Sequence, residues 1–263
     1  MSIMKISVVT PSYNQGLFIK KCIESVRRES NSAHVEHIVL DNCSMDNTVH
    51  ELQVYQRTPG RVDLKVFVEK DGGQTAAINK GFSLACGDIV CWLNTDEWFH
   101  EGSLKHVETF FLNNPEIDVV FGDCDFVDSN GVLVKEKREY LFSWSMLIYY
   151  GCFLPSCATF VRRRVIEGGT VLDSEFKVTM DFDWYVRLAK AGYRFAHLPI
   201  SLASFTWHES NISSIFVEQR LLERRMVQDR YSGVGGPAWL RYFFYGVMRY
   251  FWLIVRVIRR RLA

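Results

Sequence analysis

The sequence lacks the signatures that most directly identify a nucleotide-binding protein. No G-x-G-x-x-G follows the first apolar run, and no G-x-x-x-x-G-K-[ST] occurs anywhere in the 263 residues. A dinucleotide fingerprint and a P-loop are therefore not expected. Internal repeats are missing too, and a net charge of +1 does not indicate a nucleic-acid-binding protein. What is present is a chain with 48% hydrophobic residues, enough to bury the core of one large domain.

Cysteine pairs at metal-binding or redox spacing are missing as well. The seven cysteines never occur as C-x-x-C, and several lie inside apolar runs, so we expect reduced, buried thiols in a cytosolic protein. The N-terminal stretch MSIMKISVVTP has no long apolar segment, and we expect no secretory signal. Arg249 divides the apolar residues of 238–263, so no uninterrupted run approaches the ~20 residues that a bilayer crossing needs.

Short runs rich in Val, Ile and Phe alternate with segments of helical length. The runs are KISVVTP (5–11), VEHIVLD (35–41), DLKVFVE (63–69), DIVCWLN (88–94) and DVVFGD (118–123). The helical segments between them are 16–29, 45–56, 74–86 and 102–113. This alternation predicts βαβ units and a parallel, doubly wound sheet. Ligands of such sheets bind beyond the carboxyl ends of the strands, which is where polar residues collect in this sequence.

The alternation lapses after residue 124. Residues 125–134 predict a β-hairpin that turns at Ser129–Asn130–Gly131, and SCATFV (156–161) predicts another strand. The elements expected further on are a helix over 180–192, extended structure over 193–210 and a charged amphipathic helix over 216–231. We therefore expect a catalytic domain over 1–231, a flexible linker over 232–237 and a separate helix over 238–263.

Two adjacent carboxylates, Asp96 and Glu97, follow the fourth apolar run. Acids at such a position commonly hold a hard divalent cation or move a proton. Asn94 lies two residues before Asp96, so in an extended chain both side chains point toward one ligand. A Mg²⁺ or Mn²⁺ ion held here would complete its shell with substrate phosphates and water. On spacing alone, a solvated strand end or a helix cap remains an alternative.

Five stretches, in order along the chain, resemble the family 2 glycosyltransferases, which have the GT-A nucleotide-sugar fold. They are SVVTPSYNQGLFIKKCIESV, VLDNCSMDNT, EKDGGQTAAINKGFSLACGDIVCWLNTDE, DFDWYVRLAKAGYRF and WHESNIS, within residues 4–214. The resemblance implies an α/β fold with a Rossmann-like, mostly parallel central sheet flanked by helices. It also implies that the chain uses a nucleotide-sugar donor.

The resemblance places the nucleotide at three strand ends. Thr10, Pro11 and Tyr13 fall where the first loop of the family lies against the nucleoside. Asp41 falls where an acid accepts a hydrogen bond from the base, typically uracil, which favours a UDP-sugar. Asp71 matches a position that lines the nucleotide pocket.

The metal and the diphosphate are implied to bind at Asn94, Thr95 and Asp96, which match the D-x-D motif of the family. Asp96 is the implied ligand of Mn²⁺ or Mg²⁺. His208 matches a late histidine that helps to bind the metal or the diphosphate. Asn94 departs from the motif, because an amide accepts a hydrogen bond from ribose but brings no charge.

Asp181 matches the catalytic base of the family, which deprotonates the acceptor hydroxyl. The preceding residue is Met180, where the family often has Glu, so Asp183 is an alternative base. Trp98 and Phe99 are expected either to wall off the sugar pocket or to pack in the core.

The terminal helix is expected to carry its charge on one side. At ~100° per residue, its arginines at 241, 249, 256, 259 and 260 fall within a sector of roughly 100°. Such a helix should lie in a membrane interface and be attracted to anionic lipid. The enzyme would then be cytoplasmic and peripheral on the inner face of the cell membrane. A dimerisation helix and a helix docked on the domain are the alternatives.

These expectations describe an inverting glycosyltransferase of bacterial surface polysaccharide synthesis. Its partners would be a nucleotide sugar, a saccharide or polyprenyl-linked acceptor and an anionic membrane surface, but no nucleic acid. Two alternatives stay open. One is an inactive nucleotide-sugar-binding scaffold, suggested by Asn94 and Met180. The other is a sugar nucleotidyltransferase, which has a similar parallel sheet. Such enzymes usually have a loop with glycine and lysine after the first strand, and this sequence lacks one.

Overall fold

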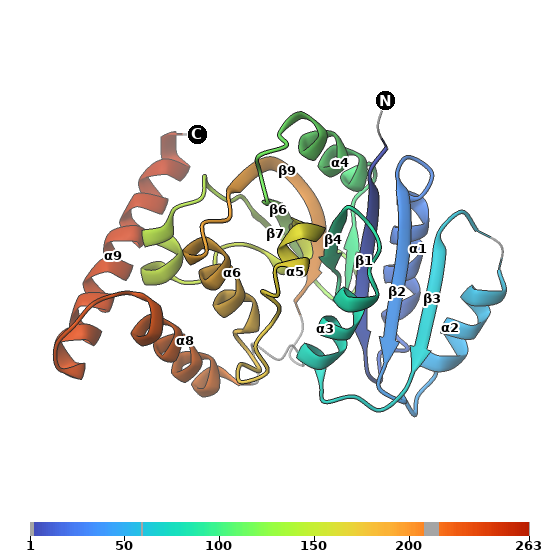
Figure 1. The fold of residues 1–263 in the computed structure, drawn as a ribbon, viewed down its shortest axis with the longest axis horizontal. Coiled ribbons are helices and arrows are strands. Elements are labelled where there is room, and N and C mark those ends of the chain that lie inside the picture. The colour runs from blue at the N-terminus through green and yellow to red at the C-terminus, as the bar shows by residue number, and fades with distance from the viewer. Residues whose placement is uncertain (1–2, 59, 208–215, 263) are drawn as a thin grey trace.

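The computed structural model describes residues 3–58, 60–207 and 216–262. These residues form one mixed sheet of nine strands, flanked by helices (Figure 1). The strand order is β3-β2-β1-β4-β8-β6-β9-β5, with β7 paired to β6. The expected α/β class with helices on the central sheet is confirmed.

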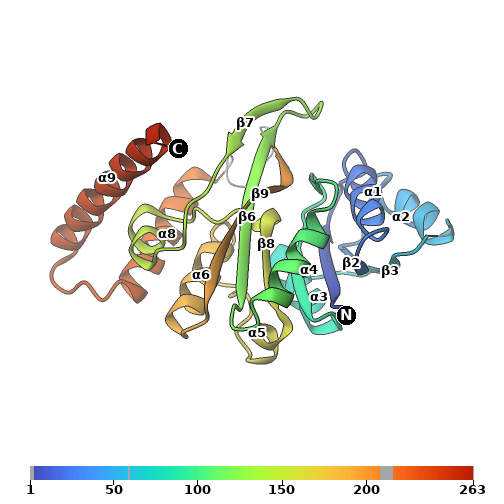
Figure 2. The ribbon, with the colours of Figure 1, turned by 90° about the horizontal axis from the view of Figure 1, so that it is seen from above.

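The N-terminal half of the sheet is parallel and doubly wound, as the alternation predicts. Its strands are β1 (Lys5–Ser12), β2 (His34–Asp41), β3 (Asp63–Val68) and β4 (Ile89–Trp92). α1 (Ile19–Glu29) and α2 (Thr48–Arg57) cover one face, and α3 (Gln74–Leu84) covers the other (Figure 2). Because both faces of β1 and β4 are covered, these strands are almost wholly buried, whereas β3 at the edge is only half-buried.

The sheet becomes mixed where the alternation lapses. β8 (Thr159–Arg162) is antiparallel to both β4 and β6 (Val119–Val127), while β9 (Phe195–Thr206) runs parallel to β6. β7 (Leu133–Lys137) forms the predicted hairpin with β6, and Gly131 in its turn has a φ of 82°. β5 (Glu97–Phe99), which the sequence pattern does not predict, pairs with β9.

The remaining described helices complete the second half of the domain. They are α4 (Ser103–Asn113), η1 (Met146–Tyr150), η2 (Ser156–Ala158), α5 (Arg163–Glu167), α6 (Met180–Lys190), α8 (Val217–Tyr231) and α9 (Ala238–Leu262). The first three residues of the predicted strand 156–161 are the 3₁₀ turn η2 rather than strand. Within the described chain, none of the helices combines the length and the hydropathy needed to span a bilayer.

An aromatic cluster attaches α6 to the end of β4. The ring centroid of Trp92 on β4 lies 5.5 Å from that of Trp184 and 6.4 Å from that of Tyr185, both on α6. All three side chains are buried. Aromatic pairs at this spacing stabilise a contact by more than their buried area alone. The cluster therefore fixes the first turn of α6 close to the carboxyl end of β4.

α9 turns part of its arginine side toward the domain. The Arg241 Nε donates to Asp229 Oδ1 on α8 over 3.0 Å. Arg256 lies 3.8 Å from the carboxylate of Glu139, which is fully buried, and its side chain is only 11% exposed. The expectation that these two arginines face anionic lipid is therefore wrong, and the helix is docked on the domain, against η1.

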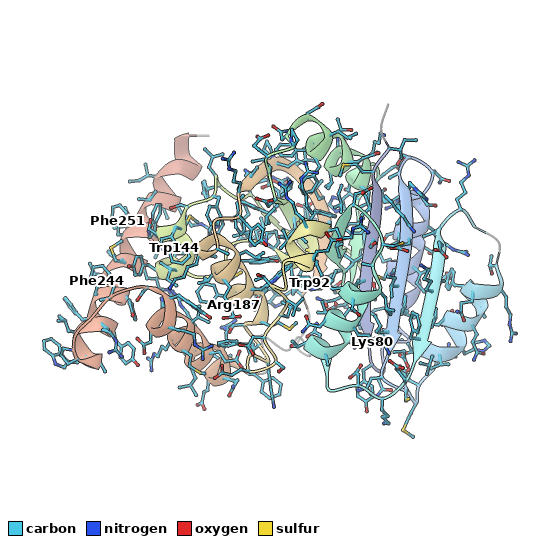
Figure 3. All side chains as sticks on the ribbon, in the orientation of Figure 1. Lys80, Trp92, Trp144, Arg187, Phe244 and Phe251 are labelled. Carbon is cyan, nitrogen blue, oxygen red and sulfur yellow. The ribbon has the colours of Figure 1, made fainter. Side chains whose placement is uncertain are left out.

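The outward side of α9 is apolar. Trp239, Phe243 and Tyr250 are 71%, 68% and 66% exposed. Phe251, 51% exposed, lies on the outer side of the helix (Figure 3). This distribution is the reverse of that of an ordinary surface helix, which buries its apolar stripe against the core.

Candidate active site

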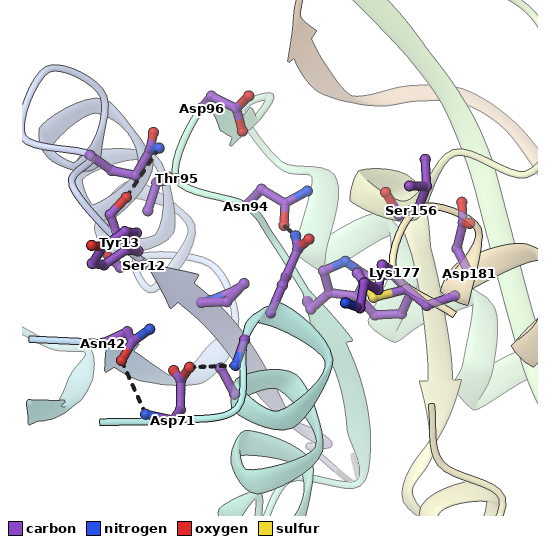
Figure 4. A pocket seen from close by; sticks show the side chains of 18 of the residues that line it. Ser12, Tyr13, Asn42, Asp71, Asn94, Thr95, Asp96, Ser156, Lys177 and Asp181 are labelled. Atoms are coloured by element: carbon purple, nitrogen blue, oxygen red, sulfur yellow. Dashed lines mark hydrogen bonds between the residues drawn. The ribbon is translucent and has the colours of Figure 1, made fainter. Parts of the chain in front are cut away.

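A pocket of about 500 Å³ lies beyond the carboxyl ends of β1 and β4, against the first turns of α3 and α6 (Figure 4). A doubly wound sheet places its ligand at this edge. Seven predicted site residues line the pocket: Pro11, Tyr13, Asp71, Asn94, Thr95, Asp96 and Asp181. Thr10, Asp41 and Asp183 do not line it. His208 lies outside the described residues.

The pocket wall at β1 and β3 is shaped by a carboxylate that caps a turn. Asp71 Oδ1 accepts a 2.7 Å hydrogen bond from the N–H of Gly73, whose φ of 101° forms the tight turn at the start of α3. The N–H of Asp71 donates to Asn42 Oδ1 over 3.0 Å. Tyr13, 52% exposed, lies on the same side of the pocket as Asn42 (Figure 4). An aromatic ring and amide groups at a lip of this kind suit a planar base.

Thr10 and Asp41 lie behind this wall rather than on it. The Thr10 hydroxyl is 2.8 Å from His37 Nε2 inside the sheet, because Thr10 precedes the end of β1 by two residues. The buried Asp41 carboxylate accepts hydrogen bonds from the Ser12 hydroxyl (3.0 Å) and from the N–H and hydroxyl of Ser44 (2.8 and 2.6 Å). Thr10 and Asp41 therefore support the residues in front of them, and their expected direct contacts with the nucleotide stay a prediction.

The two adjacent acids after β4 point in opposite directions. Asp96 lines the pocket, whereas Glu97 is fully buried and accepts a 2.8 Å hydrogen bond from the Asn94 N–H. Burial, followed by the charge of Asp96, raises the pKa of the Glu97 carboxyl well above its ordinary range. Alternation along a strand explains the split, because successive side chains of β5 and the residue before it face opposite sides.

The two aromatic residues after these acids do not wall the pocket. Phe99 is fully buried, with its ring centroid 5.8 Å from that of Phe160. The ring of Trp98 lies under the ammonium of Lys21, 3.1 Å from the ring centroid. Of the two readings of these aromatics, core packing is right for Phe99, and the sugar-pocket wall is wrong for both.

The oxygen atoms at the end of β4 suit a hard cation. Asn94 Oδ1 accepts a 2.8 Å hydrogen bond from Gln74 Nε2 and retains a second lone pair, and the Asp96 carboxylate lines the pocket nearby. The described residues contain no group of three or more His, Cys, Asp or Glu placed to hold a metal. A Mg²⁺ or Mn²⁺ ion is ordinarily held by one or two carboxylates plus substrate phosphates, so this donor set fits such an ion.

Asp181 lies across the pocket from Asn94, in the first turn of α6 (Figure 4). Its Oδ1 accepts a 2.7 Å hydrogen bond from the Phe182 N–H, and its Oδ2 lies 3.6 Å from the Cys152 sulfur. Burial raises the pKa of the Asp181 carboxyl above its ordinary value. A carboxylate whose pKa is raised toward neutrality is a better proton acceptor, which suits a general base.

Asp183 is directed away from the pocket. Two residues of an α-helix rotate a side chain by about 200°, so Asp183 and Asp181 face opposite sides of α6. The Asp183 carboxylate is fully buried and accepts a 2.7 Å hydrogen bond from Arg187 Nε. The structure therefore does not bring the alternative base into the site.

A second cavity of about 550 Å³ adjoins the first and shares Ser156, Asp181 and Phe205 with it. Its other lining residues include Lys137, Cys152, Trp207 and Arg220, and Lys177 lines the first pocket. None of these was singled out from the sequence. They come from segments without regular alternation, and the one signal in this region was the WHESNIS motif, whose first residue is Trp207.

The profile described as "Glycosyl transferase family 2" matches residues 7–183. TuaG of Bacillus subtilis (strain 168), provisionally assigned as a teichuronic acid biosynthesis glycosyltransferase, is 34% identical over 216 residues, covering 80% of this chain and 81% of TuaG. An uncharacterized glycosyltransferase of Nostoc sp. is 26% identical over 174 residues, or 62% of this chain. That match spans 52% of the Nostoc protein, so the chain covers only about half of this relative.

Solved structures share the fold at low sequence identity. The crystal structure of Staphylococcus aureus TarS 1–349 in complex with UDP-GlcNAc has a TM-score of 0.65 at 19% identity, covering 87% of this chain and 71% of that one. The mannosyltransferase PcManGT of Pyrobaculum calidifontis, in complex with GDP-Man and Mn²⁺, has a TM-score of 0.67 at 18% identity, covering 90% and 67%. The fold is therefore GT-A, as the sequence motifs imply.

Proposed function

Because the chain belongs to glycosyltransferase family 2, we propose that it transfers a sugar from a nucleotide sugar to an acceptor hydroxyl with inversion at the anomeric carbon. One observation carries the proposal. Asp96 and Asp181, far apart in the sequence, line the same pocket on different sides of it (Figure 4). Inversion needs a leaving diphosphate on one face of the anomeric carbon and a proton acceptor on the other.

The donor is proposed to lie with its nucleoside between Pro11, Tyr13 and Asp71 and its diphosphate toward Asn94 and Asp96. A UDP-sugar is the favoured donor, supported by the likeness to TarS in complex with UDP-GlcNAc. The likeness to a mannosyltransferase in complex with GDP-Man makes a GDP-sugar the competitor.

The proton of the acceptor hydroxyl is proposed to go to Asp181. The acceptor oxygen forms a bond to the anomeric carbon, the bond from that carbon to the diphosphate oxygen breaks, and the hydroxyl proton passes to a carboxylate oxygen of Asp181. The hydrogen bond from the Phe182 N–H orients that carboxylate at the start of α6. Such a base contributes about 10²–10⁴-fold in rate.

Asp96, with Asn94 and His208 as further candidates, would hold Mn²⁺ or Mg²⁺. When bound, the ion would neutralise charge that develops on the leaving diphosphate. Lys177, whose exposed side chain lines the same pocket, supplies a second positive charge near the diphosphate position.

The product is proposed to be a bacterial cell-surface polysaccharide. The name of TuaG places it in teichuronic acid biosynthesis, and TarS is named a poly(ribitol-phosphate) β-N-acetylglucosaminyltransferase. A saccharide or a polyprenyl-linked saccharide is the corresponding acceptor class.

The test is a panel of UDP-, GDP- and dTDP-sugars incubated with the protein, with and without Mn²⁺, while release of the nucleoside diphosphate is measured. We expect Mn²⁺-dependent release from one UDP-sugar and its loss in Asp96→Ala. Binding of a nucleotide sugar without any release would support an inactive scaffold instead. Release of pyrophosphate from a nucleoside triphosphate and a sugar phosphate would support a nucleotidyltransferase.

The outward side of α9 is proposed to lie on a membrane surface, in the cytoplasm of the cell. Trp239, Phe243 and Tyr250 are aromatic, strongly exposed and on one helix, which is the composition of an interfacial helix. Because Arg241 and Arg256 pair with acids of the domain, the attraction is proposed to be mainly apolar rather than to an anionic membrane surface.

A further inference from the structure

The second cavity lies where an acceptor must enter. It shares Ser156, Asp181 and Phe205 with the first pocket, so the two cavities meet at the proposed base. If the nucleotide sugar fills the first pocket, the second is the remaining side from which a hydroxyl group contacts Asp181. This inference rests on the proposed transfer reaction, and it concerns which acceptor the second cavity selects.

The charged lining of the second cavity is predominantly positive. Lys137 and Arg220 line it, and Asp181 is its one described acidic lining residue. The Lys137 side chain is only 18% exposed, and its Nζ donates to the Phe153 carbonyl over 2.6 Å and lies 2.7 Å from Glu139 Oε1. An ammonium has three protons, so Lys137 is held in place with one proton left for a ligand.

Arg220 differs from Lys137 in having an exposed side chain. It belongs to the first turn of α8, and no described carboxylate forms an ion pair with its guanidinium. Other arginines of α8 do have partners: Arg224 donates to the carbonyls of Tyr149 and Tyr150, and Arg230 pairs with Glu175. The guanidinium of Arg220 can bind a carboxylate or a phosphate in a bidentate manner.

An aromatic surface forms part of the lining of the same cavity. Trp207, 57% exposed, and Phe126 line the cavity with their ring centroids 5.8 Å apart. Flat aromatic faces bind the apolar side of a ring while a few polar groups fix its orientation. A sugar placed on Trp207 would direct one edge toward Asp181 and the rest toward Arg220.

We propose that the second cavity binds an acceptor that carries an anionic group, a carboxylate or a phosphate, paired with Arg220 and Lys137. The acceptor ring lies against Trp207, and the hydroxyl that reacts is directed to Asp181. A uronic acid within a saccharide and the phosphate of a lipid-linked sugar both supply the required charge. A neutral acceptor gives Arg220 no anionic group to pair with and leaves the third proton of Lys137 unused, which lowers its affinity relative to an anionic acceptor.

The test compares matched neutral and anionic probes in the presence of saturating UDP. Calorimetry measures the binding of p-nitrophenyl glucoside against p-nitrophenyl glucuronide, p-nitrophenyl galactoside against the galacturonide, and N-acetylglucosamine against its 1-phosphate. We expect the anionic member of at least one pair to bind about tenfold more tightly. A preference for uronides identifies a saccharide carboxylate, and a preference for the 1-phosphate identifies a lipid-linked phosphate.

Arg220→Gln should remove that preference, and Arg220→Glu should reverse it. Arg225→Gln is the matched control, because Arg225 is also exposed on α8 but packs over Tyr242 and lines neither cavity. Equal binding within every pair, no binding by any probe, or an Arg220→Gln variant that keeps the preference would overturn the inference. Release of UDP from the donor in the absence of acceptor tests the proposed function separately, and we expect Arg225→Gln to leave it unchanged.

Discussion

The sulfur of Cys152 lies 3.6 Å from Oδ2 of Asp181 and 3.5 Å from the Leu154 carbonyl, so its single proton is shared between that carbonyl and the carboxylate proposed as the base. Burial, together with the neighbouring charge of Asp181, raises the pKa of the Cys152 thiol well above its ordinary value. The thiol therefore stays protonated and can act as a donor. Cys152 lines the second cavity together with Asp181, and we expect it to act as a positioning residue for the proposed base.

Asp181→Asn should lower kcat/KM by about 10²–10⁴-fold, because an amide cannot accept the acceptor proton. In the wild type, kcat/KM should fall as the pH drops through the raised pKa of Asp181, since the base must be ionised. Initial rates over a pH series measure both effects. Asp183→Asn is the control: it weakens the buried pair with Arg187 and should reduce stability while the folded fraction keeps its rate. A larger rate loss in Asp183→Asn than in Asp181→Asn would contradict the assignment.

Cys152→Ala removes a hydrogen bond that favours the ionised form of Asp181. The pKa of Asp181 should then rise further, and the acid limb of the pH profile of kcat/KM should move to higher pH. Cys152→Ser, which keeps a donor, should move the limb less. Cys91→Ala, which removes a buried thiol that lines neither cavity, is the control for a general loss of core packing. Superimposable profiles for wild type and Cys152→Ala would show that the thiol has no such role.

Asp96→Ala should reduce donor turnover by about 10²–10³-fold, the loss typical of removing one group that stabilises developing charge. Glu97→Gln offers a control one residue away. It keeps the oxygen that accepts from the Asn94 N–H and does not line the pocket. Diphosphate release as a function of Mn²⁺ concentration distinguishes the two variants. If Glu97→Gln were as inactive as Asp96→Ala, the two acids could not be assigned separate roles.

Acid should destabilise the protein through His37. Burial lowers the pKa of His37 to about 3, whereas in the unfolded chain it is about 6.5. Between these values the unfolded state binds one more proton than the folded state, so the free energy of unfolding falls by ~1.4 kcal/mol per pH unit as the pH decreases. From pH 7 to pH 5 this group should cost about 2 kcal/mol. Urea denaturation at both pH values measures the loss, and His37→Asn should show a smaller difference between them. An equal difference in both proteins would exclude His37 as the source.

The outer side of α9 should bind lipid without requiring negative charge. Replacing Phe243 and Phe251 with Ser should reduce co-sedimentation with phosphatidylcholine vesicles by about tenfold, because two large apolar side chains no longer enter the interface. Adding phosphatidylglycerol should change wild-type binding little. Leu133→Ser, at an exposed apolar residue of β7, is the control. These substitutions are preferable to deleting 238–263, which would also uncover Glu139. Unchanged sedimentation of the Ser variant, or binding only to anionic vesicles, would contradict the proposal.

The chain order of β1 to β4 and the site at their carboxyl ends follow from the sequence alone. The apolar runs are continuous because those strands are covered on both faces, and such a run can be recognised from neighbouring residues in the sequence. The motifs at the strand ends led to seven residues that line one pocket, from Pro11 to Asp181. These features depend only on the spacing of residues along the chain, so they can be predicted from the sequence.

Only the tertiary structure decided which way individual side chains face. It turned Glu97 inward and Asp96 outward, placed Asp181 in the pocket and Asp183 against Arg187, and directed the arginines of α9 at 241 and 256 to the domain. It also assembled the second cavity from β6, β7, η2, α6 and α8. Periodicity tells which residues share a side of their own element, but which side meets another element depends on packing between distant segments.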